Sequence, residues 1–200
     1  RYSSSAASDV YKRQAQTSDE ICARKGVTRE ETDAFAARSH QRTLASIENG
    51  VFDDEIVDVV IKSRRGDKVI TAKDEDHVVR DTSPESLSKL PTAFGPDSLV
   101  TAGNASGIVD GAAAVVIKSA SQSEADGDKP LARIVGWGIV GLEPAIMAYG
   151  PVPASRKALE RTGLSIEDID RWEINEAFAG QAVACAVSYT HLRAHETVSD

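Results

Sequence analysis

The chain has 200 residues, 41% apolar and 27% charged, which is the composition of a globular protein long enough to bury a core. Its net charge of −8 argues against nucleic acid or an anionic membrane as a partner, because both bind basic surfaces. No apolar run approaches the roughly 18 residues that a membrane-spanning helix needs.

The two ends of the chain lack the periodicity of a helix or a strand. We expect residues 1–14 and 188–200 to be non-native sequence outside the folded domain. In the second segment, His191 and His195 lie four residues apart with Glu196 beside one of them, which is a spacing that helical metal sites use. We favour a polar tail instead, and we predict no metal site.

The first predicted helix spans Thr17–Lys25. Thr17 is a plausible N-cap, and Gly26 ends the helix. Cys22 lies at a small-residue position in it and is expected to be a buried structural thiol. Neither Cys22 nor Cys185 has metal-binding or redox spacing, which favours a reducing, cytoplasmic compartment.

The clearest helix is predicted over Thr28–Asn49. Thr28 and Glu31 form a capping-box pattern at its start, and Asn49 with Gly50 stops it. His40 lies on the apolar stripe of this helix. We expect it to be a packing residue with a satisfied hydrogen bond rather than a catalytic base.

Two strands are predicted next, over Glu55–Lys62 and Lys68–Thr71, with a hairpin turn at residues 64–67. The two arginines of that turn could contact the phosphates of a ligand or could simply form a solvated tip. A short helix is expected after Ser83, because Pro84 suits the first helical position.

The stretch Thr101–Ile117, TAGNASGIVDGAAAVVI, begins with residues small enough to let the backbone approach a ligand. The same small residues also serve tight packing, so this stretch alone leaves both interpretations open. Ser106 supplies its one serine hydroxyl, and the apolar run that follows is long enough to cross a core.

The second half of the chain alternates strands and helices. Ser119–Lys129 is polar and marks a boundary between two subdomains. We expect a strand at Leu131–Val140, a helix at Ala154–Thr162, a strand at Trp172–Ile174 and a helix at Glu176–Ala186. This order implies a right-handed parallel crossover.

Asn175 follows the last predicted strand. The carboxyl ends of strands are where α/β sheets bind ligands, and an Asn side chain offers an acceptor and two donors to a water or a carbonyl oxygen. Glu176 is expected to be a structural partner at the helix start rather than an acid or a base.

Four segments together resemble the thiolase family, the acyltransferases that make or cleave 3-ketoacyl-CoA: TAGNASG at 101–107, DGAAA at 110–114, GPVPASRKALE at 150–160 and INEAFA at 174–179. Weaker similarity runs from about Thr17 to Val187.

The resemblance implies an α/β fold and an internal fragment of the family domain. Residues 15–106 would be a loop subdomain that covers CoA, 107–130 the end of the N-terminal half, and 131–187 the start of the C-terminal half. The two halves are βαβαβ units in the family.

The resemblance also implies site residues. Asn175 would be catalytic and hold a water that forms an oxyanion hole, and Ser106 would hydrogen-bond the pantetheine amide of CoA. The other implied contacts to CoA or the acyl chain are Ala102, Gly103, Phe94, Ile108, Ala177, Phe178 and Arg80. Phe94 could instead be a plain core residue, and the family's phosphate-binding arginine falls nearest Val79, one residue before Arg80. A Met-Gly-x-Thr motif of the family reads Gln14-Ala15-Gln16-Thr17 here, so that only the Thr is kept.

Three catalytic groups of thiolases have no counterpart in this chain. The family's acylated Cys would lie upstream, and the His of its Gly-His-Pro motif and the Cys of its Cys-x-Gly motif would lie downstream; neither Cys22 nor Cys185 has those flanks. We therefore expect the chain alone to be inactive, with acyl-CoA as the substrate of an intact homo-oligomeric parent and no covalently bound cofactor.

The sequence leaves two alternatives open. The chain could be a non-catalytic module that binds acyl-CoA, or an α/β domain of unrelated role. If the chain is a fragment of the family domain, half of the parallel sheet is absent and apolar strands are left uncovered. We expect the isolated chain to be poorly soluble or partly disordered.

Overall fold

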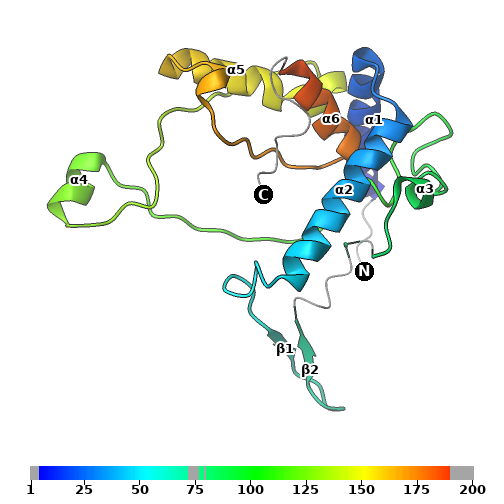
Figure 1. Ribbon diagram of the computed structural model, residues 1–200, viewed down its shortest axis with the longest axis horizontal. Coiled ribbons are helices and arrows are strands. Elements are labelled where there is room, and N and C mark those ends of the chain that lie inside the picture. Colours follow the sequence, from blue (N-terminus) through cyan, green and yellow to red (C-terminus); the bar gives the residue numbers. More distant parts are fainter. Residues whose placement is uncertain (1–4, 72–76, 79, 190–200) are drawn as a thin grey trace.

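The computed structural model describes residues 5–71, 77–78 and 80–189, and their side chains from residue 12 onward. Its elements are α1 (Ser5–Lys25), α2 (Arg29–Glu48), β1 (Val59–Ile61), β2 (Lys68–Ile70), α3 (Pro84–Leu87), α4 (Ala120–Ala125), the 3₁₀ helix η2 (Pro144–Tyr149), α5 (Pro151–Thr162), the 3₁₀ helix η3 (Ile166–Asp168) and α6 (Ala179–Ser188). Figure 1 shows α1, α2, α5 and α6 gathered together, whereas the β1–β2 hairpin and α4 lie on excursions away from them.

Helix α1 begins at Ser5, so the prediction that Thr17 caps its start is wrong. Thr17 lies inside the helix, where its Oγ1 donates to Gln14 O at 2.7 Å. Ala15 is completely buried and packs in a cluster with Val100 and Phe178. Because this packing is tertiary, the local pattern before Thr17 did not reveal it.

Helix α2 confirms its prediction in detail. Glu31 N donates to Thr28 Oγ1 at 3.2 Å and Thr28 N donates to Glu31 Oε2 at 2.9 Å, which completes the capping box. The helix ends at Asn49, followed by Gly50 with a φ of +70°. The helix packs against α3 and α6 and so links an early and a late segment of the chain.

The predicted hairpin is also present, with shorter strands. Strands β1 and β2 are antiparallel, with Val59 opposite Ile70 and Ile61 opposite Lys68. Lys62 Nζ and Asp67 form an ion pair of 2.6 Å across the turn. The apolar side chains of β1 are exposed, so little besides its own ladder holds the hairpin.

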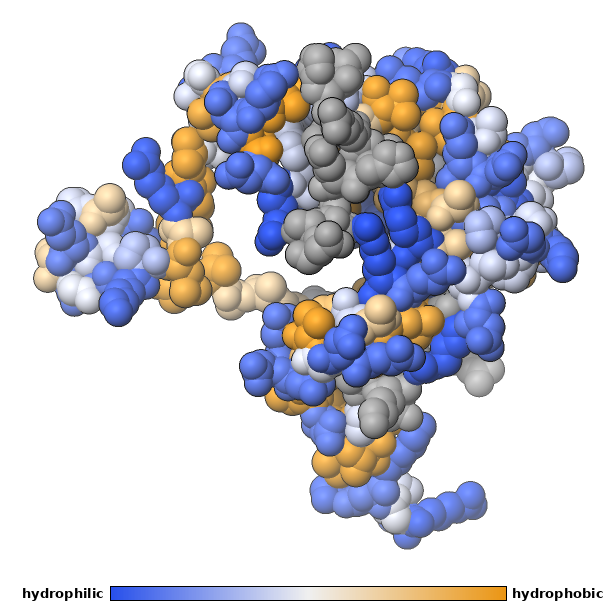
Figure 2. All heavy atoms as spheres, in the orientation of Figure 1, coloured by the Kyte–Doolittle hydropathy of each residue, from blue (hydrophilic) through white to orange (hydrophobic). Residues whose placement is uncertain are grey.

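Two predicted core segments differ from expectation. Residues 107–118 and 131–140 contain no strand, and Val115, Val116 and Ile139 are 82%, 89% and 73% exposed. The one sheet among the described residues is the β1–β2 pair, so the expected parallel crossover is not formed. Figure 2 shows apolar residues in the open along the connection between the helices and α4. The physical reason is that no described segment pairs with these residues to cover them.

Helix α5 confirms the predicted helix at 154–162 and begins earlier, at Pro151. Gly163 ends it with a φ of +69°. Gly138 lies against this helix so closely that a Cβ there would overlap Ala154 O. Lys157 Nζ also donates to Ile139 O at 2.9 Å, so the 136–139 segment follows α5 although it is not a strand.

We predict that the isolated 200-residue chain binds a hydrophobic dye such as ANS and melts without a sharp cooperative transition. The reason is the exposed apolar surface of residues 108–117 and 131–139, which a stable monomer rarely presents. Calorimetry of the purified chain, with its mass measured by light scattering, tests this. A sharp cooperative melt of a monomer would contradict the prediction.

Candidate functional site

The two segments singled out from the sequence, 101–107 and 174–179, lie side by side. An isolated antiparallel bridge pairs Ala105 with Phe178. Ser106 N donates to Ala177 O at 3.1 Å, and Ser106 Oγ donates to the same oxygen at 3.2 Å. Two loops that are 71 residues apart at this hydrogen bond therefore share one short piece of backbone pairing.

This bridge also explains why α6 begins at Ala179 rather than at the predicted Glu176. Ala179 N donates to Asn104 O at 2.9 Å, and Phe178 is extended with φ −142° and ψ 137°. An extended residue cannot be part of an α-helix, so α6 can begin only after Phe178. Glu176 therefore precedes the helix, and its Oε2 accepts a hydrogen bond of 2.9 Å from Ser39 Oγ on α2.

The predicted strand at 172–174 is absent, although its alternation is present. Trp172 and Ile174 are half-buried and pack against a cluster that includes Cys185 and Tyr189, while Glu173 is exposed. The Trp172 and Tyr189 rings lie 5.0 Å apart between centroids. The side chains alternate between buried and exposed sides as they do in a strand, but no described strand pairs with this backbone.

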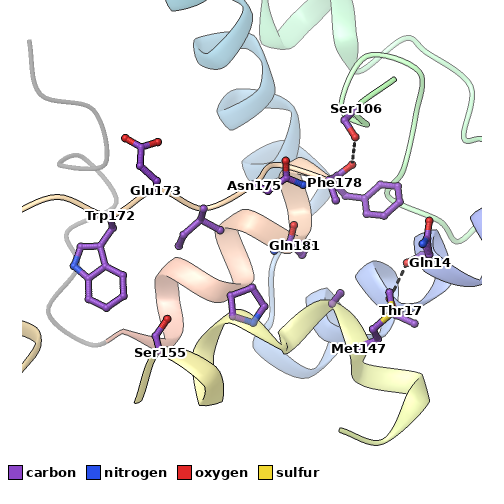
Figure 3. A pocket seen from close by; sticks show the side chains of 14 residues that line it. Gln14, Thr17, Ser106, Met147, Ser155, Trp172, Glu173, Asn175, Phe178 and Gln181 are labelled. Atoms are coloured by element: carbon purple, nitrogen blue, oxygen red, sulfur yellow. Dashed lines mark hydrogen bonds between the residues drawn. The ribbon is translucent and has the colours of Figure 1, made fainter. Parts of the chain in front are cut away.

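A cavity of about 390 Å³ opens beside the bridge. Residues from α1, the 101–107 loop, η2, α5, the 172–178 segment and α6 surround it (Figure 3). They are Gln14, Thr17, Ser106, Met147, Ala148, Pro151, Ser155, Trp172, Glu173, Ile174, Asn175, Ala177, Phe178 and Gln181. Its size falls in the range of small-molecule sites, and its lining mixes apolar side chains with polar ones, one of which is acidic, Glu173.

Four of the residues implied by the family resemblance line this cavity: Ser106, Asn175, Ala177 and Phe178. Phe94 is half-buried and packs in the adjoining cluster with Phe178 and Ala177. The structure therefore brings four of these residues around one cavity and places Phe94 beside two of them.

The other four implied residues lie elsewhere, and none of them lines the cavity. Ala102 and Arg80 are exposed, and Ile108 is 78% exposed. Gly103 is buried against α3, where a Cβ would overlap Leu87. Their contacts to CoA remain predictions.

Helix α2 holds the 101–107 loop in place from behind. Asn104 Nδ2 donates to Asp33 Oδ1 at 2.9 Å, and Arg29 Nε donates to the other oxygen of Asp33 at 2.7 Å. Thr101 N donates to Asn104 Oδ1 at 2.8 Å, and His40 Nε2 lies 2.9 Å from Gly103 O. The expectation that His40 is structural agrees with this contact.

A second cavity, of about 430 Å³, lies between α2 and α6. It shares Trp172, Glu173 and Ile174 with the first, so the 172–174 segment separates the two spaces. The first cavity is the candidate site, because it alone is lined by both segments, through Ser106 and Phe178.

Neither cysteine is placed to act as a nucleophile. Both are buried free thiols, and neither lines the cavity. Burial raises the pKa of Cys22 to about 11, and burial also raises the pKa of Cys185. A thiol becomes reactive when its pKa is lowered, so these two are structural.

We predict that Cys22 in the folded full-length protein reacts with iodoacetamide at pH 8 about 100-fold more slowly than in urea. A pKa near 11 instead of 9 lowers the thiolate fraction by about that factor. The raised pKa also means that the stability due to the buried neutral thiol is fully present below pH 9 and is lost as the pH rises toward 11. Peptide mapping of the alkylated protein measures the rate; equal rates in buffer and in urea would contradict the prediction.

Other site types find no support in the part of the chain that the structure describes. It contains no group of three His, Cys, Asp or Glu side chains able to hold a metal ion. His191 and His195 lie outside the described residues. None of the described helices has both the length and the apolar composition to cross a bilayer.

Met147 and Gln181 are among the cavity-lining residues that sequence reasoning did not assign to the site. Gln181 did carry a signal, because it is a long polar side chain in a helix otherwise made of small and apolar residues, AGQAVACAVS. Met147 lies on a 3₁₀ helix in a stretch without periodicity, and nothing in the sequence marked it.

Family models and known proteins agree on what the chain is similar to. The model of the thiolase N-terminal domain matches residues 3–121, and that of the thiolase C-terminal domain matches residues 128–195. The chain is 49% identical over 170 residues to an acetyl-CoA acetyltransferase of Syntrophomonas wolfei and 46% identical over 170 residues to a beta-ketoadipyl-CoA thiolase of Pseudomonas aeruginosa. In each case the match covers 85% of this chain and 42% of the relative.

Solved structures give the same result. The acetyl-CoA acetyltransferase of Bacillus anthracis superposes with a TM-score of 0.79 at 44% identity, over 88% of this chain and 44% of that one. The human mitochondrial 3-ketoacyl-CoA thiolase in complex with CoA superposes with a TM-score of 0.78 at 41% identity, over 88% of this chain and 43% of that one. The chain thus has the mixed helix and strand fold of part of a thiolase, and it spans less than half the length of the curated relatives it matches. Because both thiolase models match and together cover most of its residues, the chain belongs to the thiolase family.

Proposed function

We propose that the full-length protein that carries this chain is an acyl-CoA acyltransferase that makes or cleaves 3-ketoacyl-CoA by Claisen chemistry. The observation that carries the proposal is the bridge between the 101–107 loop and the 174–179 segment beside a cavity of about 390 Å³. Relatives named acetyl-CoA acetyltransferase and 3-ketoacyl-CoA thiolase support it. Fatty-acid degradation is the setting that the second name suggests.

In this proposal the chain supplies binding and transition-state stabilisation. Asn175 holds a water whose O–H stabilises the developing oxyanion, and Ser106 hydrogen-bonds an amide of the pantetheine arm. Since Ser106 Oγ already donates to Ala177 O, it would accept from that amide. Ala177 and Phe178 line the channel, with Phe94 packing beside them; Ala102, Gly103, Ile108 and Arg80 complete the proposed contacts with CoA.

The thiolate nucleophile, the base and the second thiol come, on this proposal, from parts of the full-length protein outside this chain. Acyl-CoA and CoA are its substrates, and no covalently bound cofactor is needed. The two buried free thiols support a reducing compartment, the cytoplasm. We expect the full-length protein to be a homo-oligomer.

The test is thiolysis of acetoacetyl-CoA by the purified full-length protein, followed as the loss of the 3-ketoacyl thioester when CoA is added. CoA-dependent turnover supports the proposal. Tight binding of acetoacetyl-CoA without turnover would favour a non-catalytic acyl-CoA-binding module instead.

A further inference from the structure

Gln181 is a buried polar residue whose side-chain oxygen has nothing to bind. The residue is 4% exposed and lies in the first turns of α6, where it lines the cavity of about 390 Å³ together with Asn175, Ser106 and Phe178 (Figure 3). Its Oε1 has no hydrogen-bond partner among the described residues. An unsatisfied buried acceptor costs about 1–3 kcal/mol, so such a group ordinarily has a partner in the working protein.

The orientation of the Gln181 side-chain amide is set by the hydrogen bond that its nitrogen makes. Gln181 Nε2 donates to Cys185 Sγ at 3.6 Å, and the Cys185 thiol donates to Ala148 O at 3.6 Å. Since the thiol proton is directed to Ala148 O, the sulfur can only accept from Gln181. This chain of two weak hydrogen bonds keeps Nε2 on the sulfur and leaves Oε1 as the free group.

A free acceptor selects a ligand that carries an N–H or O–H. The thioester and the 3-keto group of the proposed substrate have only acceptors, but the pantetheine arm contains two secondary amides, each with one N–H. Ser106 is exposed and Gln181 is buried, so the two side chains lie at different depths around the same cavity. An extended arm passing both could bind one amide at each.

We propose that Gln181 Oε1 accepts a hydrogen bond from an amide N–H of the pantetheine arm of the acyl-CoA substrate, which makes Gln181 a specificity residue for thioesters that carry this arm. The inference rests on the proposed function and adds to it a residue that none of the motifs identified. Gln181 takes no part in proton transfer and contacts the substrate away from the reacting carbon.

The test compares two substrates in one full-length variant, Gln181→Met, which keeps the length of the side chain and removes the acceptor. The first substrate is acetoacetyl-CoA, and the second is the acetoacetyl thioester of a simple alkane thiol, which has no amide. With CoA saturating, kcat/KM for acetoacetyl-CoA should fall about fivefold to twentyfold, the effect of one lost hydrogen bond. For the amide-free thioester it should change by less than about twofold.

Because both values come from the same preparation, their ratio is independent of the fraction of the variant that is folded. The acetoacetyl thioester of N-acetylcysteamine, which keeps only the amide nearer the sulfur, then locates the contact. If the variant also has a lower kcat/KM for this thioester, Gln181 binds the nearer amide. If its kcat/KM for this thioester is unchanged, Gln181 binds the farther amide. The matched control is Gln122→Met on the exposed helix α4, which should leave every value unchanged.

Equal losses with acetoacetyl-CoA and with the amide-free thioester would overturn the proposal, because Gln181 would then bond only to water or to protein. No loss with either substrate would overturn it as well. Both results leave CoA-dependent turnover by the wild-type protein intact, so they are distinguishable from failure of the proposed function.

Discussion

Asn175→Ala in the full-length protein is expected to lower kcat for thiolysis by about 10²–10³-fold, which is the usual effect of removing one oxyanion-hole donor. The KM for acetoacetyl-CoA should change little, because the oxyanion exists only in the transition state and not in the bound substrate. Asn175 lines the cavity beside Phe178, where the reacting carbonyl is proposed to lie. Steady-state kinetics at saturating CoA give both constants.

The matched control for this substitution is Asn49→Ala. Asn49 is an exposed residue at the C-terminal end of α2 and does not line the cavity, so its replacement should leave kcat unchanged. A full-length Asn175→Ala enzyme that turns over at the wild-type rate would show that the oxyanion role does not belong to this residue.

The second large effect is expected on stability, from Asp33→Ala. The Asp33 side chain is 1% exposed and is paired with Arg29 and hydrogen-bonded to Asn104. Arg29 is 23% exposed, so its charge stays partly hydrated, and the loss should be smaller than the cost of about 3–5 kcal/mol for a fully buried pair. The buried Asn104 amide also loses its hydrogen bond to Asp33, so we expect a cost of about 2–3 kcal/mol. Arg29 Nη2 also donates to Leu87 O at 2.9 Å, so the loss extends to the packing of α3 on α2.

Urea unfolding of the full-length Asp33→Ala variant measures this effect as a lower midpoint. Glu20→Ala is a close control, because Glu20 and Arg24 form an ion pair with the same spacing of four residues and the same distance of 2.7 Å. Their side chains are 44% and 46% exposed, so this pair should contribute less than about 1 kcal/mol. Equal shifts in the two variants would contradict the role assigned to the Asp33 network.

Elements with a local chemical signal were predictable from the sequence. The capping box of Thr28 and Glu31, the cap at Ser83 followed by Pro84, and Gly163 after α5 each set a helix boundary through backbone hydrogen bonds of nearby residues. The hairpin turn between β1 and β2 is local in the same sense.

Elements whose limits depend on distant contacts were not predictable. Helix α6 starts late because Ala179 N donates to Asn104 O, a residue in another part of the chain. The apolar stretches at 107–118 and 131–140 have the composition of buried strands, and what they lack is a described partner strand. We infer that their partners lie in the remaining length of the thiolase domain, since the chain spans 42% and 43% of its first two relatives.

In the candidate site, sequence motifs identified individual residues, and the structure showed how these residues lie relative to one another. Ser106 and Asn175 each followed from a short motif, but the motifs carry no distance information, so the bridge between Ala105 and Phe178 could not be derived. Gln181 was missed for a different reason. Its importance depends on an oxygen without a partner, and only coordinates show that.

On the proposed function, the 101–107 loop and the 174–179 segment together bind acyl-CoA. A crystal structure of the full-length protein with bound CoA tests it most directly. We expect the pantetheine arm to lie in the cavity between Ser106 and Phe178, within hydrogen-bond distance of Ser106 Oγ. CoA bound elsewhere, with this cavity filled by protein side chains, would contradict it.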